Sequence, residues 1–347
     1  MSEAVGAPFA KHTRAAAFRP RGLCWHEAAC YVVAEALQSR HALLAPFQTV
    51  SEIAMTDITV TFAALSDVGL TRSINEDAFQ LTDLSTGASV DASPSNGRMS
   101  VGKSGVLFTL SDGMGGHAAG EVASSTVIAS VRKTLQAGGE GPAEQRLEQA
   151  VRRANADVLA AAKTKGRHGM GATLTAVLVD QTTAYVAEVG DSRAYLLRSG
   201  QLKQLTRDQS LVQMLVDQGL MHPDEAENSP RKNILLQAMG SVEEVHAAIG
   251  QVELRQGDKL LICSDGISNA VSDAELLEIL NLNGPWPACA HLVQLANDRG
   301  GEDNLTAVVA LFEGGGLSAP APSETVTGTF SVIKDFGAGP AATVAVP

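Results

Sequence analysis

Two short stretches of this sequence place an aspartate between an apolar run and a glycine. Asp112 follows the run in GVLFTLSDGMGGH, and Asp265 follows the run in KLLICSDGIS. Asp-Gly at such a position is typical of a tight turn, because both residues favour turn geometry. The pair also suits a binding site, because glycine has no Cβ and lets another group approach the carboxylate closely. These two occurrences alone leave both interpretations open.

Four further acidic residues stand at the ends of apolar segments and favour a binding site. Asp191 follows one segment in AEVGDSRAYL, Asp303 precedes another in GEDNLTAVV, and RSINEDAFQL contains Glu76 and Asp77. Clustered carboxylates repel one another and lose hydration, so they need a compensating charge. Oxygen ligands without Cys or His indicate a hard cation such as Mg²⁺ or Mn²⁺. Arg72 is a candidate phosphate clamp, since its planar guanidinium matches phosphate oxygens.

The overall composition narrows the class of protein. The 347 residues are 45% hydrophobic and 18% charged, as in ordinary globular proteins. The net charge of −12 argues against a general nucleic-acid binder, which needs a basic face. The four cysteines have neither zinc-like nor disulfide-framework spacing, so free thiols are expected. No apolar run approaches the roughly 18 residues that span a bilayer, and no secretory signal is visible. We therefore expect a cytoplasmic protein without membrane insertion.

Changes in composition divide the chain into three zones. Residues 1–54 predict an N-terminal extension, poorly structured or with one short helix over 26–44, and Met55 is a candidate for the working start. Residues 55–313 contain regular apolar patterns and predict the folded domain. Residues 314–347 begin GGGLSAPAPSET and are rich in Gly, Pro, Ala, Ser and Thr, which predicts a flexible C-terminal tail.

The folded domain is expected to contain both strands and helices. Apolar runs of strand length predict strands over 105–110, 172–179, 183–189, 194–198, 259–263 and 305–312. Short polar turns join most of them and favour antiparallel pairing, whereas 84–105 is expected to be a long hairpin loop. Helices are predicted over 121–136, 143–163 and 288–298, and another after a capping-box pattern at Ser272 and Glu275. Sheets with grouped helices indicate an α+β layered sandwich.

Seven motifs resemble a known family when they are taken together. RSINED, SDGMGGH, GMGATLTAVL, VGDSRAYL, LTRDQSLVQMLVDQG, CSDGIS and GEDNLTAVV occur in the order found in the PPM (PP2C-like) metal-dependent protein serine/threonine phosphatases, bacterial branch. Each motif alone is weak, but seven in register over residues 59–312 are specific. The resemblance implies a central antiparallel β-sandwich flanked by helix pairs, a four-layer αββα fold. It also implies two Mn²⁺ or Mg²⁺ ions in a cleft at one end.

The resemblance also implies which residues bind the ions. Asp112 would bridge both ions, and the Gly113 carbonyl would bind one of them. Asp265 and Asp303 would complete the other site. Asp191, with Asp265, matches the position of a third ion in bacterial members.

The remaining roles implied by the resemblance concern water and substrate. Glu76 and Asp77 would hold or orient metal-bound waters, and Arg72 would bind the substrate phosphate, so that an activated water attacks phosphorus in line. One departure concerns the general acid: eukaryotic members have a histidine two residues after the bridging aspartate, where this sequence has Met114. His117 does not simply inherit that role, and a metal-bound water is an alternative proton source.

The segment 208–245 is similar to the flap of bacterial members, a helical insertion beside the cleft. Its Arg231 and Lys232 could meet phosphopeptide charge or could be a solvated basic pair. Three functions are compatible with the sequence. The first is a phosphoserine/phosphothreonine protein phosphatase that opposes a bacterial Ser/Thr kinase. The others are a catalytically silent phosphoprotein-binding module and a hydrolase of another phosphate ester. The retained carboxylates favour the first.

Overall fold

The strands of this protein form two antiparallel sheets in a computed structural model that describes residues 58–115, 118–163 and 168–335. The first sheet has the order β10-β9-β12-β13-β1-β4. Its strands are β1 (Thr59–Asp67), β4 (Ser95–Ser100), β9 (Arg193–Arg198), β10 (Gln201–Gln204), β12 (Lys259–Cys263) and β13 (Leu305–Glu313). The predicted extension over 1–54, with its helix over 26–44, lies outside the described residues.

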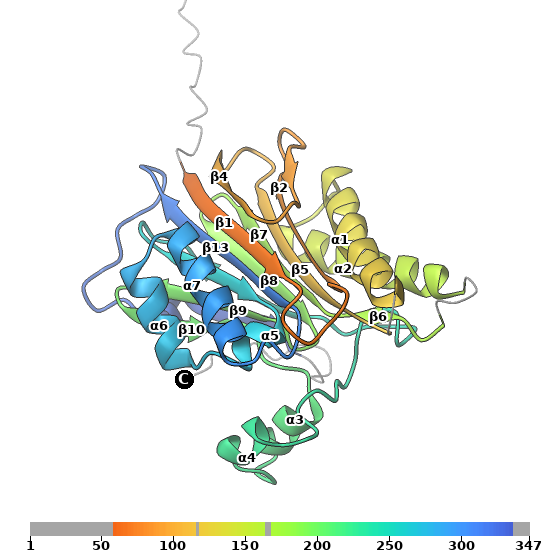
Figure 1. Ribbon diagram of the computed structural model, residues 1–347. Helices are drawn as coiled ribbons and strands as arrows, with labels where there is room; N and C mark the ends of the chain where they lie inside the picture. Colours follow the sequence, from red (N-terminus) through yellow and green to blue (C-terminus); the bar gives the residue numbers. More distant parts are fainter. Residues whose placement is uncertain (1–57, 116–117, 164–167, 336–347) are drawn as a thin grey trace, which may run out of the picture. The chain divides into compact units, whose positions relative to one another are not determined.

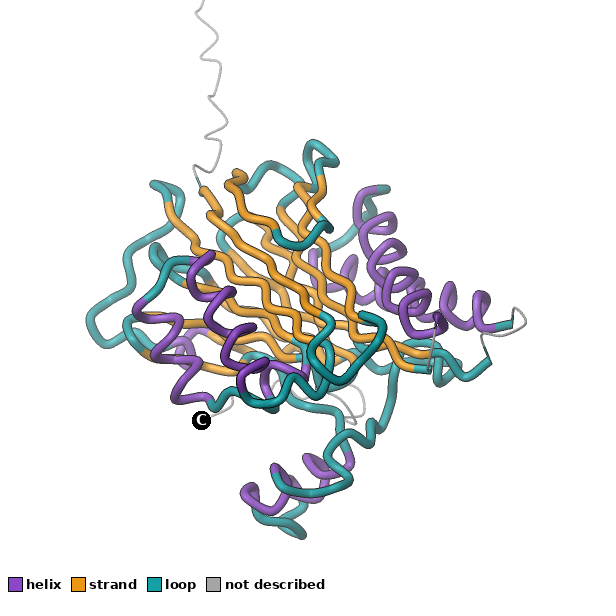
Figure 2. The backbone as a smooth tube through the Cα atoms, viewed as in Figure 1, coloured by secondary structure: helices purple, strands orange, loops and turns teal. Residues whose placement is uncertain are grey.

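The second sheet has the order β14-β11-β8-β7-β5-β2-β3, and the short strand β6 pairs with β5. Its strands are β2 (Asp77–Asp83), β3 (Ser89–Val90), β5 (Val106–Met114), β6 (Gly171–Ala172), β7 (Leu174–Asp180), β8 (Thr183–Val189), β11 (Ala248–Glu253) and β14 (Phe330–Lys334). The two sheets lie face to face (Figure 2), and apolar side chains from both fill the space between them. Phe108 of β5 meets Phe312 of β13 there edge to face, with ring centroids 6.2 Å apart.

Helices cover both outer faces of this sandwich (Figure 1). The helices α1 (Ala118–Gln136) and α2 (Ala143–Ala162) pack on the second sheet, and α6 (Asp273–Leu282) and α7 (Pro285–Asp298) pack on the first. The expected four-layer αββα sandwich is therefore confirmed. None of the helices in the described residues is both long enough and apolar enough to cross a membrane.

Local signals in the sequence explain where two of the helices begin. The predicted capping box is present, because Ser272 and Glu275 satisfy backbone N–H groups at the start of α6. Helix α7 begins at Pro285, three residues before the predicted start. Proline is well tolerated at the first helical position, where its missing N–H would have no partner.

Two predicted irregular segments contain regular structure instead. The stretch expected to be one long hairpin loop, 84–105, includes β3 and β4, and β4 pairs with β1 from Ala64↔Ser95 to Thr59↔Ser100. Its polar and glycine-rich composition concealed a strand at the edge of the first sheet. Edge strands tolerate such composition, because one of their sides faces solvent.

The prediction of a flexible tail is wrong for residues 314–335. This segment contains α8 (Val326–Thr329) and β14, which adds a strand to the second sheet beside β11. Leu317 and Val326 are 4% and 1% exposed within the core between the sheets. These few buried apolar side chains are enough to hold the segment in place. They are diluted in a region of low-complexity composition, so composition alone does not predict that the segment is folded. Residues 336–347 lie outside the described residues.

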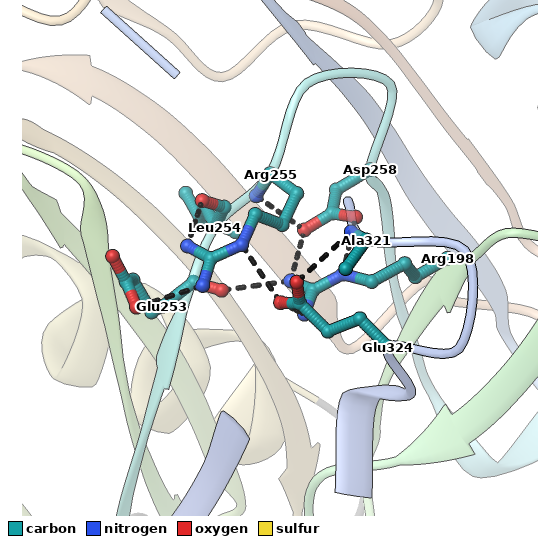
Figure 3. A network of polar contacts seen from close by, with 7 residues as sticks. All are labelled: Arg198, Glu253, Leu254, Arg255, Asp258, Ala321 and Glu324. Atoms are coloured by element: carbon teal, nitrogen blue, oxygen red, sulfur yellow. Dashed lines mark hydrogen bonds and ion pairs between the residues drawn. The ribbon is translucent and has the colours of Figure 1, made fainter. Parts of the chain in front are cut away.

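A buried network of charges holds this segment against the sandwich (Figure 3). The guanidinium of Arg198, at the end of β9, is fully buried and makes two hydrogen bonds to Asp258, of 2.9 and 2.6 Å. Arg198 also contacts Glu324 of the C-terminal segment at 3.1 Å, and Arg255 pairs with the same Glu324 oxygen at 2.7 Å. The C-terminal segment therefore supplies a counter-charge to two arginines of the sandwich.

We predict that Asp258→Ala lowers the free energy of unfolding by about 3 to 5 kcal/mol, because it leaves the Arg198 guanidinium buried without its principal counter-charge. The double replacement Arg198→Met with Asp258→Leu should recover most of that loss, since no uncompensated charge remains. Urea unfolding of the two variants measures both effects. A double variant as unstable as Asp258→Ala would show that charge pairing is not the reason.

Candidate metal-binding and phosphate-binding site

Asp77 and Asp112 stand directly opposite each other in neighbouring strands. Asp77 begins β2, and the antiparallel register of β2 and β5 pairs it with Asp112. Residues opposite each other in such a pair have Cβ atoms about 5 Å apart, and like charges there destabilise a sheet. Two carboxylates from motifs that are far apart in sequence are thus held together by the backbone of the second sheet.

The glycine after Asp112 is needed for packing. Strand β5 does not end before Asp112, as the sequence predicted, but continues through Gly113, which pairs with Ala172 of β6 and donates its N–H to the Glu76 carbonyl at 3.1 Å. A Cβ at position 113 would lie 2.1 Å from the carbonyl oxygen of Gly120 in α1. Gly113 therefore allows α1 to lie directly against the strand that carries Asp112.

The second Asp-Gly pair uses its glycine in the same way. Asp265 begins the short helix α5 (Asp265–Ser268), and a Cβ at Gly266 would lie 2.2 Å from the carbonyl oxygen of Asn304. The Asp265 side chain accepts a hydrogen bond from Asn269, one turn later, at 3.1 Å. Close backbone contact thus brings the start of α5 beside the residues that precede β13.

Asn304 organises the loop that carries the arginine and the acidic pair. Its side chain is 4% exposed, and its amide donates to the carbonyls of Val68 and Ile74, both at 3.0 Å. Its oxygen accepts the backbone N–H of Glu76 at 2.8 Å. Through these contacts, the residue just before β13 and the RSINED loop form one unit, although they are far apart in sequence.

Arg72 and Asp303 form an ion pair at this point. The distance between Arg72 Nη2 and Asp303 Oδ2 is 2.8 Å, and the Arg72 side chain is 49% exposed. The hydrogen bond to Asp303 raises the pKa of Arg72, and the charges of Glu76 and Asp112 act in the same direction. The guanidinium therefore lies in the field of the carboxylates while remaining accessible to solvent.

Hydroxyl groups that our sequence reasoning missed hold the central carboxylates. Ser264 and Thr306 donate hydrogen bonds to Asp77 Oδ2 at 2.8 and 2.7 Å. The hydroxyl of Thr173 accepts the backbone N–H of Asp112 at 2.9 Å and meets the hydroxyl of Ser192 at 2.8 Å. One signal was present in the sequence: a serine precedes the Asp-Gly pair in both SDG motifs.

Burial in one small region disturbs the ionisation of the carboxyl groups. Burial raises the pKa of Asp77 to about 7, and the charges of Asp265 and Asp303 contribute. Burial, together with the charge of Asp303, raises the pKa of Asp265 to about 6. Burial and the charges of Asp77 and Asp265 also hold the pKa of Asp112 well above its usual range. Ionisation of the whole cluster is therefore unfavourable unless a cation lies among these groups.

The residues present fit a hard divalent cation. Their donor atoms are all oxygen, and Oδ1 of both Asp77 and Asp265 is buried without a hydrogen-bond partner in the described part of the chain. No three His, Cys, Asp or Glu side chains among the described residues form a group that would hold an ion alone. Mg²⁺ binds through one or two carboxylates and keeps several waters, so it does not require such a group.

Asp191 lies beside Asp265 at the wall of a cavity below the flap. The flap contains α3 (Leu211–Asp217) and α4 (Pro223–Glu227), which project from the sandwich in Figure 1. The cavity has a volume of about 500 Å³, and its lining includes Asp191, Asp265 and Lys232. Burial and the charge of Asp265 hold the pKa of Asp191 well above its usual range. Lys232 thus faces the acidic cavity, whereas His117 lies outside the described residues.

Comparisons with known proteins agree with this geometry. The family described as "Protein phosphatase 2C" matches residues 91–310. The serine/threonine protein phosphatase PstP of Mycobacterium tuberculosis is 38% identical over 259 residues, which are 74% of this chain and 46% of that protein. The serine/threonine phosphatase stp of Listeria innocua is 37% identical over 58% of this chain and 83% of its own length.

A solved structure extends the likeness to three dimensions. The catalytic domain of PstP in complex with two manganese ions has a TM-score of 0.61 and 37% identity, and the match covers 74% of this chain and 99% of that domain. The match to full-length PstP spans about half of that protein. The chain belongs to the protein phosphatase 2C family, as its seven motifs predicted.

We predict that Gly113→Ala lowers the free energy of unfolding by about 3 kcal/mol or more, because the added methyl group would press on the backbone of α1. The matched control is Gly139→Ala, where a Cβ would first meet a side-chain carbon at 3.8 Å, and we expect a change within about 0.5 kcal/mol. Urea unfolding of both variants is the measurement. Equal stability of the two variants would contradict the packing role of Gly113.

The raised pKa of Asp265 predicts that Asp265→Asn changes the thermal stability of the cation-free protein, measured in EDTA, by an amount that depends on pH. The folded protein binds the proton of the Asp265 carboxyl group more tightly than the unfolded chain does. Loss of this proton therefore lowers the free energy of unfolding of the cation-free protein as pH rises from about 4 to about 7. We expect the melting temperature of Asp265→Asn, relative to the unsubstituted protein, to rise by roughly 5 °C over that range. The exposed control Asp298→Asn should show a flat difference. A flat difference for Asp265→Asn as well would contradict the argument.

Proposed function

We propose that this protein hydrolyses phosphoserine and phosphothreonine in other proteins with the help of two Mn²⁺ or Mg²⁺ ions. The observation that carries the proposal is the convergence of Asp77, Asp112, Asp265 and Asp303 beside the accessible guanidinium of Arg72. A chain that needed only stability would not keep these carboxylates together. The named activity of the PstP and stp relatives supports the same reaction.

The acidic residues would hold the ions. The two ions would be held by Asp112, the Gly113 carbonyl, Asp265 and Asp303. When bound, such ions supply Lewis-acid activation of water and neutralise charge on the phosphate. Ser264 and Thr306 keep one oxygen of Asp77 occupied, which leaves Oδ1 to orient water.

The substrate phosphate would bind at Arg72. Its side chain is half exposed and is held near the carboxylates by its pair with Asp303. A phosphate dianion can replace Asp303 as the partner of the guanidinium, because the phosphate oxygens match its planar fork. Glu76, whose backbone is fixed by Asn304, would orient water at the same place, and Asp191 with Asp265 would hold a third ion.

The partners follow from the reaction. Phosphorylated proteins would be the substrates, and a Ser/Thr protein kinase in the cytoplasm would supply them. The flap cavity contains Lys232 next to the acidic residues, so it would receive the part of the substrate that flanks the phosphorylated residue.

We predict that Arg72→Ala lowers kcat/KM on a phosphothreonine peptide with Mn²⁺ by about 100-fold, because it removes a charge-assisted contact to the transferring phosphoryl group. Arg98→Ala, at a 67% exposed arginine side chain on β4, is the matched control and should retain full activity. EDTA and Asp265→Asn should each abolish turnover. No Mn²⁺- or Mg²⁺-dependent turnover from folded protein, or faster hydrolysis of nucleotides than of phosphopeptides, would overturn the proposal.

A further inference from the structure

A second cavity opens at the edge of the sandwich, where β10 of the first sheet faces β11 and β14 of the second. Its volume is about 470 Å³, within the range of small-molecule sites in proteins. Its lining includes the apolar side chains of Val186, Leu205, Phe330 and Val332. Both sheets therefore contribute apolar side chains to the cavity, and polar and charged side chains form the rest of its lining.

One wall of this cavity belongs to the C-terminal segment. Phe330, Val332 and Lys334 of β14 line it, and all three lie beyond the residues 91–310 that match the family. Lys334 binds Glu148 of α2 at 2.7 Å, which fixes the end of β14. Glu324, just before α8, is held by the arginine network of Figure 3. The cavity is thus built with a part of this chain that lies outside the family match.

A buried acidic side chain lies at this cavity. Glu188 lines it and is only 2% exposed. Side chains alternate along a strand, so Glu188 lies on the same face of β8 as Val186, which belongs to the core between the sheets. Its Oε2 accepts the backbone N–H of Arg207 at 2.8 Å, but its Oε1 has no hydrogen-bond partner among the described residues. Such a group requires a partner, because a buried oxygen without one loses its hydration.

Three of the four cationic side chains that line the cavity already pair with carboxylates other than Glu188. Arg193 pairs with Asp208 at 2.7 Å, and Lys334 pairs with Glu148. Arg207 pairs with Asp217 through its side chain.

The electrostatic surroundings of Glu188 favour a positively charged partner. Burial raises the pKa of Glu188 well above its usual range, and the charges of Asp208 and Asp191 raise it further. Asp208 and Asp191 thus contribute negative potential at this carboxyl group, and Arg193 opposes it. An ammonium group placed there would gain from the potential and would satisfy the free oxygen.

We propose that this cavity binds a small organic molecule with an apolar body and one protonated amino group. The amino group pairs with Glu188, and the apolar body packs against Val186, Phe330 and Val332. The proposal does not depend on the phosphatase reaction, although this cavity shares Arg193, Gln204, Asp208 and Gln213 with the cavity below the flap. Its ligand class follows from the lining: Glu188 is a buried acid with an unpartnered oxygen beside apolar side chains, and this combination accommodates one cationic head on an apolar body.

Three probes of similar shape and different charge test the proposal by calorimetric titration of the full chain. They are 2-phenylethylamine, 2-phenylethanol and phenylacetate. We expect the amine to bind most tightly, and Glu188→Gln to weaken its binding by about tenfold or more while leaving the alcohol nearly unchanged. The matched control is Glu278→Gln, at an exposed position on α6, which should bind the amine like the unsubstituted protein.

A second variant keeps the test independent of any folding defect in Glu188→Gln. Val332→Phe fills the cavity from β14 while Glu188 stays in place, and it should abolish binding of both the amine and the alcohol. Phenylacetate as the tightest probe would overturn the proposal in favour of Lys203, for which the described residues show no ion-pair partner. Amine binding unaffected by Glu188→Gln, or no saturable binding of any probe, would also overturn it and leave a hydrated cavity.

Discussion

Repulsion between carboxylates at one end of the sandwich is the constraint on which the site depends. The register of β2 and β5 places Asp77 opposite Asp112, and Asp265 and Asp303 add charge from the other sheet. Burial at this point raises carboxyl pKa values far enough that the ionised cluster opposes folding at neutral pH. A divalent cation removes that opposition, so the protein's stability and its proposed chemistry depend on the same groups.

The local structure around the cluster reduces its freedom to spread apart. Gly113 and Gly266 allow backbone contacts that a Cβ would prevent, so α1 and the loop before β13 lie against the acidic strands. Hydroxyls from Ser264 and Thr306 bind one oxygen of Asp77 and leave the other available. The glycines therefore serve the site indirectly. They shape the backbone that holds the carboxylates, rather than leaving open space beside them.

The C-terminal segment covers one edge of the sandwich and helps to form the cavity there. Strand β14 covers the outer edge of β11, and the charges of Glu324 and Asp258 balance Arg198. An added edge strand protects the backbone groups of its neighbour. It also completes the wall of the cavity at this same edge of the sandwich, beside Glu188. Composition predicted a flexible tail here, because the few buried side chains that fix the segment are diluted among Gly, Pro, Ser and Thr.

The sequence by itself determined the strands with apolar runs, the main helices, the capping box at Ser272 and the family, because these depend on local patterns and on short motifs in order. It also identified the acidic residues and Arg72. Only the tertiary structure decided that Asp77 faces Asp112, that Asn304 fixes the loop of Glu76, and that the segment after Glu313 is folded. The physical reason is that strand register, close backbone packing and burial each join residues far apart in the chain, and no local pattern records such pairings.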